Sequence, residues 1–179
     1  MNSFGDESYF PDLNKFVVAD GINKQIIEWK NTGEMVDSAI KSISSERSKN
    51  IKIQNNTGDL EIYTDQMFEK VFYNLIENAI THGKRLTEIK IYYVETKPEK
   101  ECKLIIENDG IGIPEKNKEK IFEKKFGRYT GLGLFLVKEI LDINQMKIKE
   151  TGKEDTGATF EIIISGDKYR IDQEKVQKY

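Results

Sequence analysis

Two asparagines, Asn74 and Asn78, lie four residues apart in a mostly apolar segment. On a helix this spacing places both amide side chains on one face, although asparagine is a poor helix-interior residue because its side chain competes for backbone hydrogen bonds. An amide oxygen is a hard, neutral ligand that suits Mg²⁺, which takes few protein oxygens and completes its shell with water and substrate phosphates. The pair therefore indicates either a solvated helix face or a magnesium–phosphate site, and the spacing alone favours the solvated face.

A second group of candidate residues is the run Asn108-Asp109-Gly110-Ile111-Gly112-Ile113-Pro114, which directly follows an apolar strand pattern. Aspartate and glycine are common in tight turns, so the run is compatible with a simple turn. The carboxylate of Asp109, held at the end of a strand, could instead accept a hydrogen bond from the exocyclic amine of adenine. Gly110 and Gly112 would then let the loop pack against the base. The run alone favours neither interpretation.

A third group is Thr130-Gly131-Leu132-Gly133-Leu134, which opens an apolar helical pattern. Glycine is costly in a helix, but at a helix start it exposes backbone N–H groups that bind phosphate with the help of the helix dipole. Lys124, Lys125 and Arg128, just upstream, could reach the same phosphates. The alternative is a loop with solvated basic residues, and a lone G-x-G is a weak signal.

The elements that position these residues follow from the hydrophobic pattern. Apolar residues at helical spacing between 35 and 43 predict one amphipathic helix. A second predicted helix begins at a cap on Thr64 or Asp65, carries the two asparagines and ends near Gly83. A third is predicted over 131–143.

Alternating and β-rich runs predict the strands. These strands are 51–53, 60–63, 88–95, 102–107, 146–150 and 158–164. We expect the first two to form a hairpin around the turn at 55–59, and the last two to form another. Helices and strands are interspersed without regular βαβ alternation, which favours an α+β fold. We therefore expect a two-layer α/β sandwich, with a mixed sheet of about five strands covered by about three helices.

Composition narrows the possible partners. The chain has 179 residues, a net charge of −3 and 33% charged residues, which is typical of a well-solvated globular protein. This charge gives no reason to expect nucleic acid or an anionic membrane as a partner, and no run of about 18 apolar residues is present. Cys102 is the only cysteine, so no disulfide framework forms, and we expect a cytoplasmic setting.

Taken in order, the motifs resemble those of the catalytic, ATP-binding domain of sensor histidine kinases. This domain belongs to the Bergerat-fold class, which also holds DNA gyrase, the Hsp90 chaperones and the MutL repair proteins. The resemblance covers roughly residues 31–165. Its parts are the N box at 74–79, the G1 box at 109–113, the F box at 121–123 and the G2 box at 131–134. Only residues 113–130 separate the glycine boxes, so the chain resembles the short-lidded kinases common in archaea.

This resemblance implies ATP and Mg²⁺ as ligands and a role for each matching position. Asn78 would be the metal ligand, Asn74 would support it, and Asp109 would bind the adenine amine. Arg128, with Lys124 or Lys125, would contact the phosphates, and Thr159, in Gly157-Ala158-Thr159-Phe160, would close the adenine end. The implied catalytic residues are Asn74, Asn78 and Arg128. The full set of implied nucleotide contacts is Asn74, Asn78, His82, Asp109, Gly110, Gly112, Ile113, Lys124, Lys125, Arg128, Thr130, Gly131, Leu132, Gly133, Leu134 and Thr159.

The resemblance also implies partners. The γ-phosphate would pass to a histidine on a separate dimerisation hairpin, and from there to a response regulator. His82 is the only histidine, and it ends the N-box helix, so we expect it to line the nucleotide site rather than accept phosphate. We expect no self-labelling, no membrane contact by this domain and an isolated monomer. Residues 1–30 resemble the remnant of a linker after the hairpin, residues 31–165 the catalytic domain, and residues 166–179 a polar tail.

One position separates the activities known in this class. In gyrase-like ATPases and anti-sigma serine kinases, a glutamate four residues before the metal-binding asparagine is the general base. Here that position is Asn74, whose amide cannot take a proton. Glu77 is a poor substitute because it lies about 100° around the helix from Asn78. The motifs therefore favour transfer to histidine; the alternatives are a catalytically silent ATP-binding regulatory module and an anti-sigma-type serine kinase.

Overall fold

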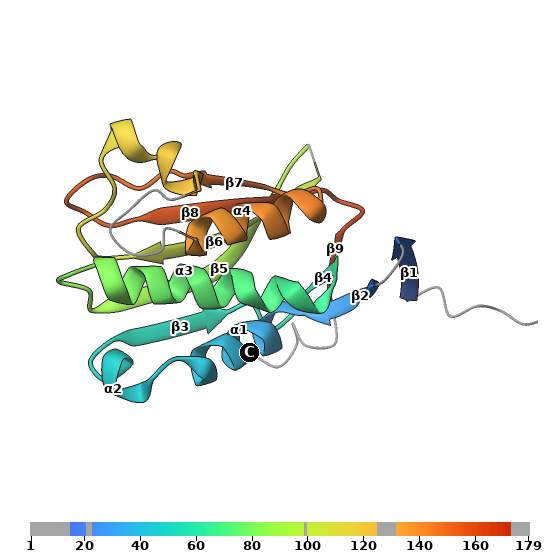
Figure 1. Cartoon of the computed structure of the whole chain (residues 1–179), viewed down its shortest axis with the longest axis horizontal. Helices are drawn as coiled ribbons and strands as arrows, with labels where there is room; N and C mark the ends of the chain where they lie inside the picture. Colours follow the sequence, from blue (N-terminus) through green and yellow to red (C-terminus); the bar gives the residue numbers. More distant parts are fainter. Residues whose placement is uncertain (1–14, 21–22, 99, 125–131, 173–179) are drawn as a thin grey trace, which may run out of the picture.

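The computed structural model describes residues 15–20, 23–98, 100–124 and 132–172 (Figure 1). The strands are β1 (Lys15–Asp20), β2 (Asn23–Asn31), β3 (Lys52–Asn56), β4 (Leu60–Thr64), β5 (Glu88–Thr96), β6 (Glu101–Asn108), β7 (Lys147–Glu150), β8 (Thr159–Ile164) and β9 (Tyr169–Ile171). The α-helices are α1 (Thr32–Ser42), α2 (Ser45–Ser48), α3 (Glu69–His82) and α4 (Gly133–Ile143). Short 3₁₀ turns lie at η1 (Gln66–Phe68), η2 (Glu115–Asn117) and η3 (Lys120–Phe122).

The main sheet has five strands in the order β3-β5-β6-β8-β7. The β3–β5 pair is parallel and the other pairs are antiparallel, so the sheet is mixed. Helices α1, α3 and α4 lie side by side across one face of this sheet, with α3 in the middle (Figure 1). The predicted α+β fold, two layers with one mixed five-stranded sheet under three helices, is confirmed, and so is the hairpin of the last two predicted strands.

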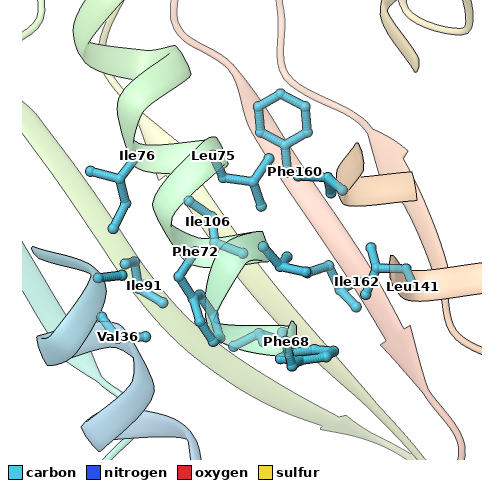
Figure 2. Close-up of a cluster of buried hydrophobic side chains, with 14 of the residues drawn as sticks. Val36, Phe68, Phe72, Leu75, Ile76, Ile91, Ile106, Leu141, Phe160 and Ile162 are labelled. Atoms are coloured by element: carbon cyan, nitrogen blue, oxygen red, sulfur yellow. The ribbon is translucent and has the colours of Figure 1, made fainter. Parts of the chain in front are cut away.

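The core lies between α3 and the sheet. The apolar stripe of α3 is fully buried at Phe72 and Ile76, and it faces strand residues such as Ile91, Ile106 and Phe160 (Figure 2). Burying one such large side chain stabilises the fold by about 1.5–3 kcal/mol. This packing fixes the rotation of α3 about its axis, and with it the direction of the polar side chains on its other face. In the described part of the chain, no helix is long and apolar enough to cross a bilayer.

The prediction that the first two predicted strands form a hairpin is wrong. β3 pairs with β5 in the main sheet, whereas β4 pairs with β2 and β9 in a second, four-stranded sheet of order β1-β2-β4-β9. The turn between them crosses from one sheet to the other and is held by Asn31, whose Nδ2 donates to the Gly58 carbonyl at 2.8 Å. Alternation predicts a strand but not its partner, because pairing depends on residues far away in the sequence.

The first and the last described segments of the chain contribute strands to the second sheet. The segment expected to be a linker remnant contains β1 and β2, and β2 runs into α1 through Asn31, whose Oδ1 caps the helix by accepting from Glu34 N at 3.0 Å. The segment expected to be a polar tail contains β9, where Arg170 lies 4.4 Å from the ring centroid of Trp29. The partners of β9 lie more than 100 residues earlier, so its own short sequence gave no signal.

Candidate functional site

The two asparagines of the N box lie on the face of α3 that does not enter the core. α3 follows η1, which is capped by Asp65: its Oδ1 accepts from Met67 N at 2.6 Å. Asn74 and Asn78 are partly exposed, while their neighbours Leu75 and Ala79 are buried. Among the described residues, none forms a hydrogen bond with the Asn78 side chain. Its amide oxygen is therefore available to a metal ion, in line with the preference of Mg²⁺ for oxygen ligands.

Asn74 connects the N box to the start of α4. Its Nδ2 donates to the Lys70 carbonyl at 2.7 Å, which directs Oδ1 away from that turn of the helix. A Cβ placed on Gly133 would lie 3.1 Å from this Oδ1, so the first turn of α4 packs directly on the amide. The structure thus brings together two motifs separated by more than 50 residues of sequence.

The first turn of α4 has backbone donors that no side chain of the described residues caps. Its N-cap is Leu132, which makes no side-chain cap, so the first N–H groups of α4 have no partner from a capping side chain. Lys124 lies close by, with its Nζ 5.9 Å from the centroid of the Phe135 ring. Leu134 packs partly on the core, whereas Leu132 is 43% exposed. N–H groups without a capping side chain, the positive end of the helix dipole and a lysine together suit an anion.

The loop after β6 packs on the C-terminal end of α3. A Cβ on Gly110 would come within 2.9 Å of the Gly83 Cα, which leaves room only for glycine at this contact. Gly83 itself closes α3, with its N–H donating to the Ala79 carbonyl at 2.8 Å. Ile113, further along the loop, packs partly against the core. The glycine loop 108–113 therefore meets the end of the helix that carries Asn78.

The same glycine loop is fixed from the other side by the β7–β8 loop, residues 151–158. Gly112 has a φ of +69°, and a Cβ there would lie 2.6 Å from the Lys153 carbonyl oxygen. Gly157 has a φ of +133°, and a Cβ there would lie only 1.8 Å from the Asn108 carbonyl oxygen. Asp155 N donates to the Ile111 carbonyl at 2.8 Å. Glycine is required at both positions, by dihedral angle and by close contact.

Asn108 is a candidate contact residue that the sequence reasoning missed. It pairs across the strands with fully buried Ile89, so its side chain points to the helix-covered side of the sheet. Its Oδ1 accepts from Gly110 N at 3.1 Å and from Ala158 N at 3.5 Å. The signal was available: Leu104, Ile106 and Asn108 alternate along β6, and this places Asn108, not Asp109, on the core side.

Asp109 points elsewhere. Its Oδ1 accepts from the backbone N–H groups of Thr87, at 2.8 Å, and Glu88, at 2.9 Å, and its Oδ2 accepts from the Thr87 hydroxyl. Partial desolvation acts to raise the pKa of Asp109, but these hydrogen bonds outweigh it and lower the pKa below its usual range. The carboxylate is therefore ionised and already bound to the start of β5.

Asp109 and Thr159 both line a hollow of about 250 Å³ on the open face of the sheet. The other lining residues are Glu88, Lys90, Glu107, Asn108, Lys153, Thr156 and Gly157. Thr159 precedes buried Phe160 on β8, so strand alternation turns its side chain away from the helices. Strand alternation thus directs Thr159 away from the face that carries Asn74 and Asn78, and its role at the adenine end of the site stays a prediction.

Two residues at the C-terminal end of α3 have distinct environments. Glu77 forms an ion pair with Arg47 at 2.6 Å, and the same guanidinium donates to the Thr81 hydroxyl at 2.6 Å. Glu77 is thus occupied on the side of α3 that faces α2. His82 is exposed at the last position of α3. Lys125, Arg128, Thr130 and Gly131 lie outside the described residues, and their roles stay predictions.

The chain is similar to known ATP-binding domains. Residues 63–167 match the family described as histidine kinase-, DNA gyrase B-, and HSP90-like ATPase. The histidine protein kinase SaeS of Staphylococcus aureus is 27% identical over 146 residues. That match covers 72% of this chain but 42% of SaeS, so the chain spans less than half the length of this relative.

Solved structures agree with this similarity. The catalytic domain of the histidine kinase ThkA is 27% identical, with a TM-score of 0.65 over 78% of this chain and 95% of that domain. The mycobacterial sensor histidine kinase MprB, at 18% identity, shares the fold, with a TM-score of 0.68 over 78% of this chain and 97% of that one. The family match covers more than half of the chain and includes α3, the glycine loop and α4. The chain therefore belongs to the histidine kinase-, DNA gyrase B-, and HSP90-like ATPase family.

Proposed function

We propose that this chain is the ATP-binding catalytic domain of a two-component sensor histidine kinase. It binds ATP with Mg²⁺ and transfers the γ-phosphate to a histidine on a separate dimerisation domain, from which a response regulator receives it. The observation that carries the proposal is the contact of Asn74 with Gly133, which joins the asparagine face of α3 to the donor-rich start of α4. We assign this role to residues 31–165, on the cytoplasmic side of a sensor.

In this proposal the phosphates lie between α3 and the start of α4. The Asn78 amide oxygen is the protein ligand of Mg²⁺, and the backbone N–H groups at Leu132 and Gly133 hold the phosphate oxygens, with Lys124 and Arg128 supplying positive charge. The metal ion would neutralise charge on the transferred phosphoryl group. The protein supplies positioning and electrostatic stabilisation, the main contributions that phosphoryl transfer requires.

The purine lies against the glycine loop 108–113. Asn108 faces the helix side; its Oδ1 already accepts from Gly110 N and Ala158 N, so its Nδ2 is the group that can donate to an acceptor atom of the base. Asp109 is the alternative base contact, with one acceptor position left beside Thr87 and Glu88. Asn108→Ala and Asp109→Ala distinguish them: the residue that contacts the base is the one whose loss weakens ATP and adenosine binding by the same factor.

Transfer to a histidine is favoured over hydrolysis because, within the described part of the chain, no carboxylate is placed to activate water on the asparagine face. Asn74 occupies the position one turn before Asn78, and Glu77 forms an ion pair with Arg47 on another side of the helix. An amide cannot accept a proton from water at neutral pH. Slow intrinsic ATP hydrolysis is therefore expected.

Calorimetric titration with a non-hydrolysable ATP analogue tests the binding step. Saturable 1:1 binding is expected, weakened both by EDTA and by Asn78→Ala. Asn56→Ala, an exposed asparagine on β3, is the matched control and should bind as the wild type does. Absence of binding under every condition would refute the proposal and leave a fold retained without its nucleotide.

The transfer step is tested with γ-labelled ATP and the histidine-bearing hairpin encoded with this domain, in the same chain or in a partner. Label on the hairpin that is lost in acid and kept in alkali identifies phosphohistidine. Acid-stable label on a protein serine would instead support the anti-sigma-type kinase. Binding without any transfer would support the silent regulatory module. His82 should remain unlabelled throughout.

A further inference from the structure

A buried ion pair joins the end of β7 to the segment that follows the glycine loop. The side chain of Glu150 is fully buried, and its Oε2 lies 3.4 Å from Nζ of Lys118, whose side chain is 13% exposed. A carboxylate is rarely buried to this extent unless it is paired and hydrogen-bonded. Neither residue belongs to the proposed nucleotide contacts, so the pair calls for another explanation.

Glu150 ties together both ends of the β7–β8 loop. Its Oε1 accepts from Gly152 N at 3.0 Å, near the start of the loop, and from Thr159 N at 3.0 Å, directly after the end of the loop. Lys118 adds a third tie, because its Nζ donates to the Gly152 carbonyl at 2.5 Å. The loop is thus closed by one carboxylate and one ammonium group.

The closed β7–β8 loop packs against the glycine loop 108–113. Lys153 and Gly157 carbonyl oxygens lie against Gly112, and Asp155 N donates to the Ile111 carbonyl. Lys118 follows Ile113 by five residues, so the pair also fixes where the chain leaves the glycine loop. A shift of either charged residue would displace the glycine loop both through its contact with the β7–β8 loop and through the chain segment that leads to Lys118.

We propose that Lys118 and Glu150 are positioning residues for nucleotide binding, which hold the β7–β8 loop and residues 115–118 so that the glycine loop 108–113 keeps the shape that receives the purine. This inference rests on the proposed function. It assigns the pair to the base side of the site, and no contact with the phosphates is required.

The electrostatics agree with a permanent link. The hydrogen bond to the exposed Glu115 carboxylate, 3.0 Å away, raises the pKa of Lys118, and the charge of Glu150 raises it further. Lys118 therefore stays protonated throughout the neutral range, and the link should not switch with physiological pH.

The test compares Lys118→Met and Glu150→Gln with a matched control, Lys103→Met. Lys103 forms an ion pair with Glu161 at 3.2 Å on the same sheet, but the two side chains are 37% and 22% exposed. Affinities for Mg-ATP and for adenosine are measured by calorimetry at a temperature at which circular dichroism shows every variant fully folded. Both test variants should bind ATP and adenosine about tenfold more weakly, by equal factors, as expected for misplaced contacts.

The control should stay within about twofold of the wild type. The double variant Lys118→Met/Glu150→Gln should lose no more affinity than the worse single variant, because the two residues act as one unit. Lowered melting temperature with ATP and adenosine affinities unchanged would overturn the inference and leave the pair a purely structural role. A loss restricted to ATP, with adenosine affinity kept, would also overturn it.

Failure of the proposed function gives a different pattern, because the wild type itself would not bind ATP. In that case the positioning role is tested by NMR, from the backbone amide resonances of Ile111 and Gly112 in the nucleotide-free protein. Shifts at both amides in Lys118→Met, absent in Lys103→Met, support the positioning role. Unchanged resonances in Lys118→Met overturn it.

Discussion

Replacing Gly112 by alanine is the most informative single change in the glycine loop. Its φ of +69° is unfavourable for alanine, and the added Cβ would lie 2.6 Å from the Lys153 carbonyl oxygen and 2.9 Å from that of Gly157. Both neighbours are backbone atoms, so no side-chain rotation relieves the contact. The left-handed conformation costs about 1–2 kcal/mol and overpacking about 1–3 kcal/mol. We therefore expect Gly112→Ala to lower the free energy of unfolding by about 2–5 kcal/mol.

Urea unfolding followed by circular dichroism measures this change, with stability taken from linear extrapolation. The melting temperature should fall by about 5–20 °C for a domain of this size. Gly58→Ala is the matched control, because a Cβ at Gly58 would meet no atom within 4 Å and its φ is not positive. It should leave stability unchanged or raise it by up to about 1 kcal/mol. Equal stabilities of the two variants would refute the assigned packing of the glycine loop on the β7–β8 loop.

Three further predictions concern single side chains. In the folded protein the pKa of Asp109 lies below the value it has in the unfolded chain. The ionised carboxylate therefore stabilises the fold above the unfolded pKa, and this stabilisation is lost as the pH falls through the folded pKa. Asp109→Asn should flatten the fall in urea midpoint between about pH 5 and pH 3. An unaltered pH profile would argue against the Thr87 and Glu88 hydrogen bonds. Burial, with a smaller contribution from Glu95, raises the pKa of Cys102 to about 12, so a thiol reagent at neutral pH should modify it only when the protein unfolds. Modification at the rate of a free thiol would contradict the burial. Phe72→Ala removes a fully buried ring and should cost about 3–5 kcal/mol in thermal or urea unfolding, whereas Val94→Ala, at an exposed position, should cost less than about 0.5 kcal/mol.

The layers of the fold could be predicted because they depend on local patterns. The stripe of α3 and the alternation in β5 and β6 repeat over many residues, and each repeat adds to the signal. The second sheet could not be predicted in the same way. Its strands β2, β4 and β9 come from three distant parts of the chain, and β9 has only three residues. The position of β9 depends on its pairing with β4 and on the contact of Arg170 with Trp29, and no local sequence pattern encodes these contacts.

The candidate site was predictable to the level of motifs but not of side-chain direction. Asn74 and Gly133 were both selected from the sequence, and the structure brings them into contact. Asp109 was chosen for its carboxylate, yet strand alternation directs the neighbouring Asn108 to the helix side. Lys118 and Glu150 gave no signal, because each is an ordinary charged residue until the fold buries them together. Residue types that can carry chemistry are visible in a sequence, but the face of the sheet on which each one lies can be assigned only once the strand register is known.

A crystal structure of the chain with Mg²⁺ and a non-hydrolysable ATP analogue would show directly where the nucleotide binds. We expect the triphosphate between α3 and the first turn of α4, with the Asn78 amide oxygen about 2.1 Å from the metal ion and the purine against the glycine loop. A nucleotide bound instead in the open-face hollow beside Glu88 and Lys90, or a metal ion without Asn78 as ligand, would contradict it.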